Sequence, residues 1–283
     1  MKKNYLALGG LFACLHVIFL LMSKFLVGSE LILVLFLPLL STIYTLKCDK
    51  KSVIMFLIAT VLVCSIFDVI STFIYVVPSL ICGVLYGGLR KLRFKELELL
   101  TITSFGHMVS LFFSFLVITL LFKEVNFMEI FSSIFNVSGK ALFVVTLLTL
   151  LVLGYAEAFL VHVITDKELS RFTTSIEKNE NVPKWFLYCS AFCFVVSVIL
   201  YIFDDIYYAI PLTLLYVFLV PLIIMGFINL KYKKVTFSLI LMNVFLSILV
   251  LKYISPLGYI FIPLLITTPF IINNFKEYEE KNF

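Results

Sequence analysis

The chain of 283 residues is 62% hydrophobic and 14% charged, with a mean hydropathy of +1.13. Soluble domains contain about 45–50% apolar and about 25% charged residues, so one globular core could not hide this much apolar surface from water. The composition also excludes a disordered chain. The net charge of +5 is spread along the sequence rather than gathered in a nucleic-acid-binding arm. The sequence therefore predicts a polytopic membrane protein that binds no nucleic acid.

Ten apolar segments are candidates for transmembrane helices, each of which needs about 20 residues to cross the bilayer core. No signal-peptide cleavage site follows the first segment, so we expect that segment to be retained as a span. The expected fold is an all-α transmembrane helix bundle of about ten spans. These cover residues 5–22, 30–46, 52–67, 69–89, 98–122, 139–164, 184–203, 207–229, 235–252 and 256–275.

Basic residues predict the orientation of these spans. With ten spans and both termini in the cytoplasm, 18 of the 22 lysines and arginines fall in cytoplasmic segments, as the positive-inside rule requires. This arrangement needs a turn at Asp68, because one long helix over residues 53–89 would place the basic cluster at 90–95 outside the cell. We therefore expect a multi-pass protein of the cell membrane with both termini cytoplasmic.

Two connections are longer than simple turns. Residues 123–140 predict a short amphipathic helix on the outer membrane face, with an apolar side formed by Phe127, Ile130, Phe131, Ile134 and Phe135. Residues 165–184 form a polar cytoplasmic loop, which separates a six-span region (1–164) from a four-span region (185–283). This loop is either a solvated connector or a surface that recruits partner proteins.

Motifs that would indicate catalysis are missing. The sequence has no Walker-type glycine loop, no H-E-x-x-H and no G-x-S-x-G, so we expect no enzymatic activity, no catalytic residues, no cofactor and no nucleotide hydrolysis by this chain. Five of the six cysteines lie in apolar runs, where they are interpreted as small apolar filler. Cys189 and Cys193 lie one helical turn apart without a histidine or carboxylate at metal-site spacing, so no metal site is predicted.

Ionisable residues inside predicted spans are functional candidates, because hydrocarbon makes them costly. His107 lies about 13 Å, and Glu157 about 10 Å, from the cytoplasmic ends of neighbouring spans at 1.5 Å per residue. We expect the two side chains to meet inside one bundle, where Ser110 and Ser114 extend the polar stripe from His107. Two interpretations stay open: a structural hydrogen-bonded pair, or a substrate cavity or proton path. His16, alone in the first span, is interpreted as a packing residue.

Small residues recur at four-residue spacing in the first span, where Gly9 and Ala13 would let another helix approach closely. A proline-containing second span, a short turn and the glycine-rich run 78–90 follow. This order resembles the YybS-like family of bacterial multispan membrane proteins. The N-terminal half of that family looks like the six-helix substrate-binding (S) components of energy-coupling-factor vitamin transporters.

The resemblance covers roughly residues 5–164. It implies a membrane bundle that binds a small solute, with Gly9 and Ala13 facing the helix of a membrane coupling subunit. No vitamin-pocket residue can be transferred to this chain, because no ligand motif matches. The four C-terminal spans depart from the S-component architecture, so dependence on a shared energising module does not follow from the resemblance.

Two functions are compatible with the sequence. The first is a transport-related membrane protein that binds a small solute in its N-terminal bundle, surrounded by lipid and joined by a coupling subunit or another protein partner. The alternative is a non-transporting scaffold or an assembly or regulatory factor that recruits partner proteins. A polar-lined cavity within residues 5–164 would favour the first function, and a solid core would favour the second.

Overall fold

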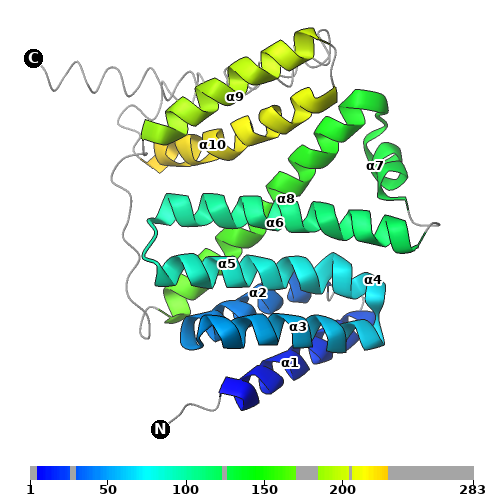
Figure 1. The fold of residues 1–283 in the computed structure, drawn as a ribbon, viewed down its shortest axis with the longest axis vertical. Helices are drawn as coiled ribbons and strands as arrows, with labels where there is room; N and C mark the ends of the chain where they lie inside the picture. The colour runs from blue at the N-terminus through cyan, green and yellow to red at the C-terminus, as the bar shows by residue number, and fades with distance from the viewer. Residues whose placement is uncertain (1–4, 26–29, 123–125, 170–183, 204–205, 229–283) are drawn as a thin grey trace, which may run out of the picture. The chain divides into compact units, whose positions relative to one another are not determined.

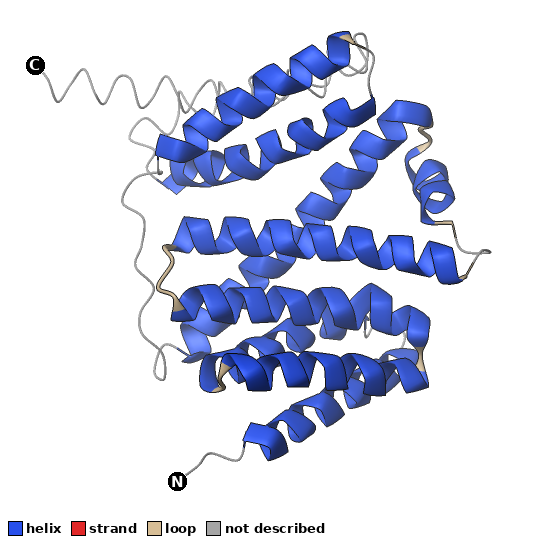
Figure 2. Cartoon of the chain, in the orientation of Figure 1, coloured by secondary structure: helices blue, strands red, loops and turns tan. Residues whose placement is uncertain are grey.

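The computed structural model describes residues 5–25, 30–122, 126–169, 184–203 and 206–228. Every regular element within these ranges is helical (Figure 1, Figure 2), which confirms the all-α class for the described residues. The predicted spans at 235–252 and 256–275 and the polar loop that follows residue 169 lie outside them. The chain divides into two compact units, residues 1–137 with 146–179 and residues 138–145 with 180–283.

The helices follow the apolar segments of the sequence. The first unit contains α1 (Tyr5–Phe25), α2 (Glu30–Lys47), α3 (Lys50–Phe67), α4 (Val69–Ser71), the π-helical turn η1 (Thr72–Val76), α5 (Val77–Lys91), α6 (Glu96–Leu121), α7 (Phe127–Phe135) and most of α8 (Gly139–Leu169). The second unit contains α9 (Lys184–Ile202), the 3₁₀ turn η2 (Ile206–Tyr208) and α10 (Ala209–Ile228).

Five helical stretches among the described residues are long and apolar enough to cross a membrane. They are Tyr5–Phe25, Lys50–Phe67, Val69–Lys91, Glu96–Leu121 and Gly139–Lys167. In the second unit the apolar helical stretches, Tyr188–Ile202 and Ile206–Pro221, are shorter. The prediction of several transmembrane helices is thus supported, whereas the number ten and the division into six and four spans stay predictions.

The turn expected at Asp68 is present. Asp68 has extended backbone angles between α3 and α4, and its carboxylate accepts hydrogen bonds from the Ser71 backbone N–H at 3.1 Å and from the Ser71 hydroxyl at 2.7 Å. A side chain that accepts these hydrogen bonds is a preferred helix N-cap, because it satisfies donors that have no partner within the helix. The segment 53–89 is therefore two helical stretches rather than one long helix.

Pro78 accounts for the π-helical turn η1. A proline inside a helix has no N–H to donate to the carbonyl four residues earlier, and its ring crowds that carbonyl. The turn Thr72–Val76 lies immediately before this position, and the Val77 backbone N–H donates to the Thr72 carbonyl five residues earlier. The wider turn lets the helical stretch continue through the proline into α5.

Close contacts between α2 and α5 depend on glycine. A Cβ atom at Gly83 would collide with the backbone carbonyl of Pro38, and one at Gly87 would lie 2.9 Å from the Thr45 Cβ atom. Gly83 and Gly87 thus form a small-xxx-small face, the pattern that lets transmembrane helices pack tightly. Thr42 strengthens this contact, because its hydroxyl donates to the Gly83 carbonyl at 3.1 Å.

Polar contacts join turns at each end of the first unit. Lys91 Nζ donates to the Cys48 carbonyl at 2.6 Å, which ties the α2–α3 turn to the end of α5. Lys24 Nζ lies 3.0 Å from Asp68 Oδ2, which ties the end of α1 to the α3–α4 turn. The sequence assigns the α2–α3 turn and the end of α5 to one side of the membrane. It assigns the end of α1 and the α3–α4 turn to the other side, so both contacts agree with the predicted alternation of the spans.

The helix α7 was expected from the amphipathic pattern at 123–140. Asn126 caps it, accepting from the Met128 backbone N–H at 3.1 Å, and Asn136 ends it in the left-handed conformation. Phe127 stacks on Phe115 of α6, with ring centroids 4.2 Å apart. The apolar side of α7 therefore packs partly on the bundle, and its predicted position on the outer membrane face stays a prediction.

Candidate functional site

His107 and Glu157 meet inside the first unit. His107 Nε2 on α6 lies 2.8 Å from Glu157 Oε2 on α8, and the two residues are only 2% and 4% exposed. The other ring nitrogen, Nδ1, lies 3.2 Å from the backbone carbonyl of Pro78 on α5. Three helices of the first unit, all within candidate membrane spans, therefore meet at the imidazole.

The contacts of the imidazole determine how many protons the His107–Glu157 pair holds. A backbone carbonyl can only accept, so Nδ1 carries a hydrogen and donates it to Pro78. Nε2 and the carboxylate oxygen would repel as two bare acceptors at this distance, so one proton must lie between them. Whether His107 is the imidazolium or Glu157 is the protonated acid, the pair as a whole is electrically neutral, which suits its burial.

A third ligand-type group lies beside the pair. Cys82 on α5 is fully buried, and one potential ligand atom from each of Cys82, His107 and Glu157 lies within 4.8 Å of the other two. The apolar run around Cys82 predicts small apolar filler, because nothing in the spacing along the chain links this cysteine to the other two residues. Its depth does carry a signal, since Cys82 lies about 10 Å from the end of its predicted span at 1.5 Å per residue, as Glu157 does.

Several buried polar atoms of this region have no hydrogen-bond partner among the described residues. They are Glu157 Oε1, the Thr103 hydroxyl and the hydroxyls of Ser110 and Ser114. Ser110 and Ser114 line a shallow hollow of about 280 Å³ between α5 and α6, and most of its other lining residues are apolar. The structure thus places the two serines on the same helix as His107, and their role as substrate-cavity residues stays a prediction.

A second polar network lies about one to three helical turns from the pair along the same helices. Tyr86 Oη lies 3.0 Å from His162 Nδ1, and His162 Nε2 lies 3.1 Å from Glu96 Oε1. Arg90 donates to the Tyr86 hydroxyl at 3.4 Å and lies 3.8 Å from the Asp166 carboxylate. This network joins α5, α6 and α8 where α6 begins and α8 ends, and so holds together the three helices that carry the buried pair.

His16 has partners for both ring nitrogens. Nδ1 lies 2.8 Å from the Phe12 carbonyl, one turn earlier in α1, and Nε2 lies 3.3 Å from the Ser41 hydroxyl of α2. The ring also packs edge-on against Phe56 of α3. These contacts agree with the packing role expected for a lone histidine in the first span.

Gly9 and Ala13 lie on the side of α1 that faces α2 and α3. A Cβ atom at Gly9 would lie 3.0 Å from the Tyr44 hydroxyl, and that hydroxyl donates to the Tyr5 carbonyl at 3.1 Å. Part of the small-residue face is thus used within the chain.

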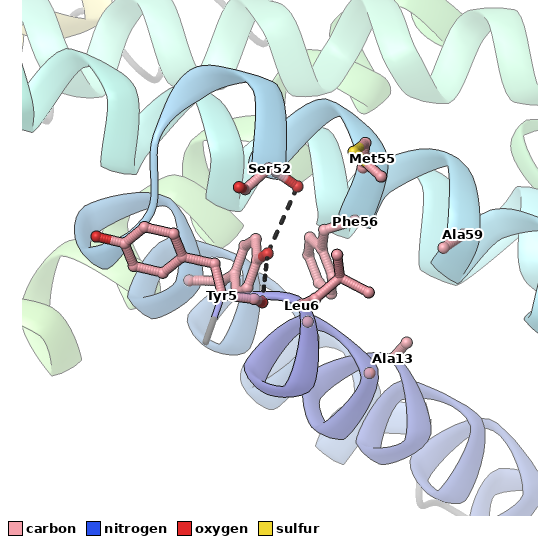
Figure 3. A pocket seen from close by; sticks show the side chains of 10 residues that line it. Tyr5, Leu6, Ala13, Ser52, Met55, Phe56 and Ala59 are labelled. Carbon is pink, nitrogen blue, oxygen red and sulfur yellow. Dashed lines mark hydrogen bonds between the residues drawn. The ribbon is translucent and has the colours of Figure 1, made fainter. Parts of the chain in front are cut away.

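A half-open hollow of about 680 Å³ remains beside this face, between α1 and α3. Figure 3 shows Leu6 and Ala13 of α1 on one side of it and Met55, Phe56 and Ala59 of α3 on the other. A role of Gly9 and Ala13 in binding a partner helix stays a prediction.

Part of the chain matches a known protein family. A family described as "Predicted membrane protein (DUF2232)" is similar to residues 14–146 of the chain. The long apolar helices and this similarity both indicate a protein that is embedded in a membrane. The chain is an integral membrane protein. No curated protein and no solved structure matches it, so the YybS-like and S-component resemblance has no support from these comparisons.

The matched region includes two of the three clustered residues. Cys82 and His107 fall within residues 14–146, whereas Glu157 lies beyond them. The family similarity therefore covers α5 and α6 but only the first two turns of α8, and it ends before the carboxylate of Glu157. The family's description names no activity.

Proposed function

We propose that this membrane protein takes part in transport and binds a small solute in its first unit, without hydrolysing nucleotide itself. The observation that supports this most directly is the buried carboxylate of Glu157, of which Oε2 contacts His107 while Oε1 has no partner among the described residues. A purely structural pair would be expected to satisfy both oxygens, because an unsatisfied buried acceptor costs about 1–3 kcal/mol. The free oxygen is therefore the place where a solute would bind.

The position of the pair also supports this function. Ionisable side chains within membrane spans are rare and mark substrate or ion pathways by default. Here the pair lies where α5, α6 and α8 meet, and a π-helical turn and a proline lie in the helical stretch next to it. Such turns are frequent at functional sites.

A test uses Glu157→Gln. The glutamine amide has nearly the same shape and can donate to His107 Nε2, so the variant is expected to fold while losing the negative charge. Untargeted mass spectrometry would compare small molecules in cells that overproduce the wild type, this variant, or the control Glu98→Gln in the first turn of α6. We expect at least one compound whose cellular level changes with the wild type and with Glu98→Gln but not with Glu157→Gln. Identical profiles for all three proteins would contradict the proposal.

The alternative function, a scaffold that recruits a partner helix, is favoured by the hollow between α1 and α3. Gly10 lines it, and a Cβ atom there would meet nothing within 4 Å. Gly10→Leu would fill the hollow without disturbing α2. If the scaffold function is correct, proteins that co-purify with the wild type in mild detergent should be lost from Gly10→Leu and kept by Leu11→Ala, which changes an exposed residue outside the hollow. Unchanged co-purification with Gly10→Leu would argue against it.

A further inference from the structure

We propose that Cys82, His107 and Glu157 form a binding site for a divalent transition-metal ion of the Zn²⁺ class. The site stands on the geometry of these three residues. Only its use rests on the proposed function, in that we take the solute of the first unit to be this cation.

The ligand set comes from three different helices and is already assembled. One ligand atom from each of Cys82, His107 and Glu157 lies within 4.8 Å of the others. Zn²⁺ is held at about 2.3 Å by sulfur and about 2.0–2.2 Å by nitrogen and oxygen, which places ligand atoms around one tetrahedral ion roughly 3–4 Å apart. Small side-chain rotations therefore suffice for all three groups to bind one ion.

His107 is oriented as a metal ligand. Its Nδ1–H donates to the Pro78 carbonyl, so the nitrogen that is left to bind a metal is Nε2, which lies 2.8 Å from Glu157 Oε2. Histidine ligands usually donate their second ring N–H to a carboxylate or a backbone carbonyl, which fixes the tautomer and the ring orientation. Pro78 and Cys82 belong to the same helix, α5, so this helix holds the imidazole and also supplies the sulfur.

Charge balance makes such a site compatible with burial. Zn²⁺ bound to a thiolate, a carboxylate and a neutral imidazole has no net charge. Without the ion, the Cys82 thiol has one proton and the His107–Glu157 pair shares another, which is also neutral. Binding therefore exchanges one divalent cation for two protons and leaves no uncompensated charge in the membrane interior.

The donor types decide the class of ion. Ca²⁺ and Mg²⁺ prefer oxygen ligands throughout, whereas thiolate and imidazole together select Zn²⁺ and neighbouring transition metals. Three protein ligands also leave a fourth position open, in contrast to structural zinc sites with four. A site of this kind can release its ion, as a transported cation requires, and the unpartnered Glu157 Oε1 offers a further oxygen.

Cobalt provides the direct test, because Co²⁺ bound to a thiolate absorbs in the near ultraviolet. The full-length chain would be purified in mild detergent, freed of metal with a chelator and titrated with Co²⁺. We expect one equivalent to bind with a thiolate charge-transfer band, and Zn²⁺ to displace it. Cys82→Ser should abolish the band. The control Cys64→Ser, which changes a buried thiol of α3 outside the cluster, should keep it.

The other two ligands have their own readouts. His107→Gln and Glu157→Gln should each weaken Co²⁺ binding by at least about tenfold, with melting temperatures measured to show that the variants fold. A variant-free measurement uses the wild type in mild detergent, where Zn²⁺ should slow the alkylation of the buried Cys82 by N-ethylmaleimide but not that of the exposed Cys14. Absence of a charge-transfer band in the folded wild type, a band that survives in Cys82→Ser, or alkylation of Cys82 that proceeds at the same rate with and without Zn²⁺ would overturn the site.

Reconstituted liposomes separate this inference from the proposed function. Stoichiometric Zn²⁺ binding with no Zn²⁺ flux into liposomes would leave the site in place and overturn its use in transport. An organic compound that co-purifies with the wild type but not with Glu157→Gln, in a protein that binds no Co²⁺, would overturn the metal site and support solute binding. Co²⁺ binding together with Zn²⁺ uptake that is lost in Cys82→Ser would support both.

Discussion

At the scale of single residues, the central feature is a polar pair that the bundle keeps neutral. Pro78 fixes the hydrogen of His107 on Nδ1, and the 2.8 Å contact with Glu157 then requires one shared proton. Removal of one partner leaves the other buried polar side chain without its contact, whereas removal of both leaves neither side chain unpaired. Stability changes at the two positions should therefore depend on each other.

A double-mutant cycle tests this dependence. We expect Glu157→Leu and His107→Leu each to lower the free energy of unfolding. The sum of these two decreases should exceed the decrease measured for the double variant. The expected coupling is about 1–2 kcal/mol, the upper range for hydrogen bonds between helices in membranes. Unfolding in mixed micelles would measure it. Additive effects would mean that the two side chains do not interact.

Asp68, which lies in a turn between two candidate spans, should make the stability of the fold depend on pH. Burial alone would raise the pKa of Asp68, but the hydrogen bonds from Ser71 and the ammonium of Lys24 hold it below its ordinary value of 3.8. Because the pKa is lower in the folded state, the carboxylate stabilises the fold above the ordinary value. That contribution is lost as the pH falls through 3.8 toward the folded-state pKa.

Melting temperatures measured between about pH 6 and pH 3 check this sign. The melting temperature of the wild type should fall toward the acid end, and that of Asp68→Asn should fall less steeply. Lys24→Gln should show an intermediate slope, because it removes the ion pair and leaves the Ser71 hydrogen bonds. A slope for Asp68→Asn equal to that of the wild type would show that Asp68 does not contribute.

At the scale of helices, glycine residues allow very close backbone contacts in the first unit. Gly154 of α8 lies against α6, where a Cβ atom would be 2.5 Å from the Ser104 carbonyl. Gly83 lies in the same way against the Pro38 carbonyl of α2. A backbone carbonyl cannot rotate away as a side chain can. The helices would therefore have to move apart to accommodate a larger residue at either position.

Two alanine substitutions on α5 measure this effect. Gly83→Ala should lower the free energy of unfolding by about 1–3 kcal/mol, as overpacking does. Gly88→Ala is the matched control, because a Cβ atom there meets nothing within 4 Å, and alanine should raise helix stability by up to about 1 kcal/mol. Equal effects at the two positions would contradict the packing that the structure describes.

The same elements show how far the sequence alone predicts the fold. The lengths of the apolar segments and the charge rule predict where helices begin and end, including the turn at Asp68. They do not predict which face of each helix meets a neighbour, because lipid and protein interior are both apolar and neither selects a rotation of the helix. For this reason the glycine face of α5 was missed. His107 and Glu157 could be paired by depth because both are ionisable, whereas Cys82, at a matching depth, was interpreted as apolar filler.

At the scale of the whole molecule, the structure links turns that the charge rule assigns to the same side. Lys91 reaches the Cys48 carbonyl at one end of the first unit, and Lys24 reaches Asp68 at the other. These contacts show which turns lie on the same side of the membrane. The positive-inside rule then assigns the end that contains Lys91 and Cys48 to the cytoplasm.

Cysteine labelling tests that assignment. In a chain whose six native cysteines are replaced, a cysteine at position 91 should resist a membrane-impermeant thiol reagent added to intact cells and react after the membrane is opened. A cysteine at position 24 should react in intact cells. Labelling of position 91 from outside, with position 24 protected, would invert the proposed orientation.

Solute binding by the buried pair is the central claim for the molecule, and native mass spectrometry of the full chain released from mild detergent tests it most directly. The wild type and Glu98→Gln should each have a population with one additional bound mass, whether a metal ion or a small organic molecule. Glu157→Gln should fold and lack that mass. A wild type with no bound mass, or a Glu157→Gln variant that retains it, would contradict the account.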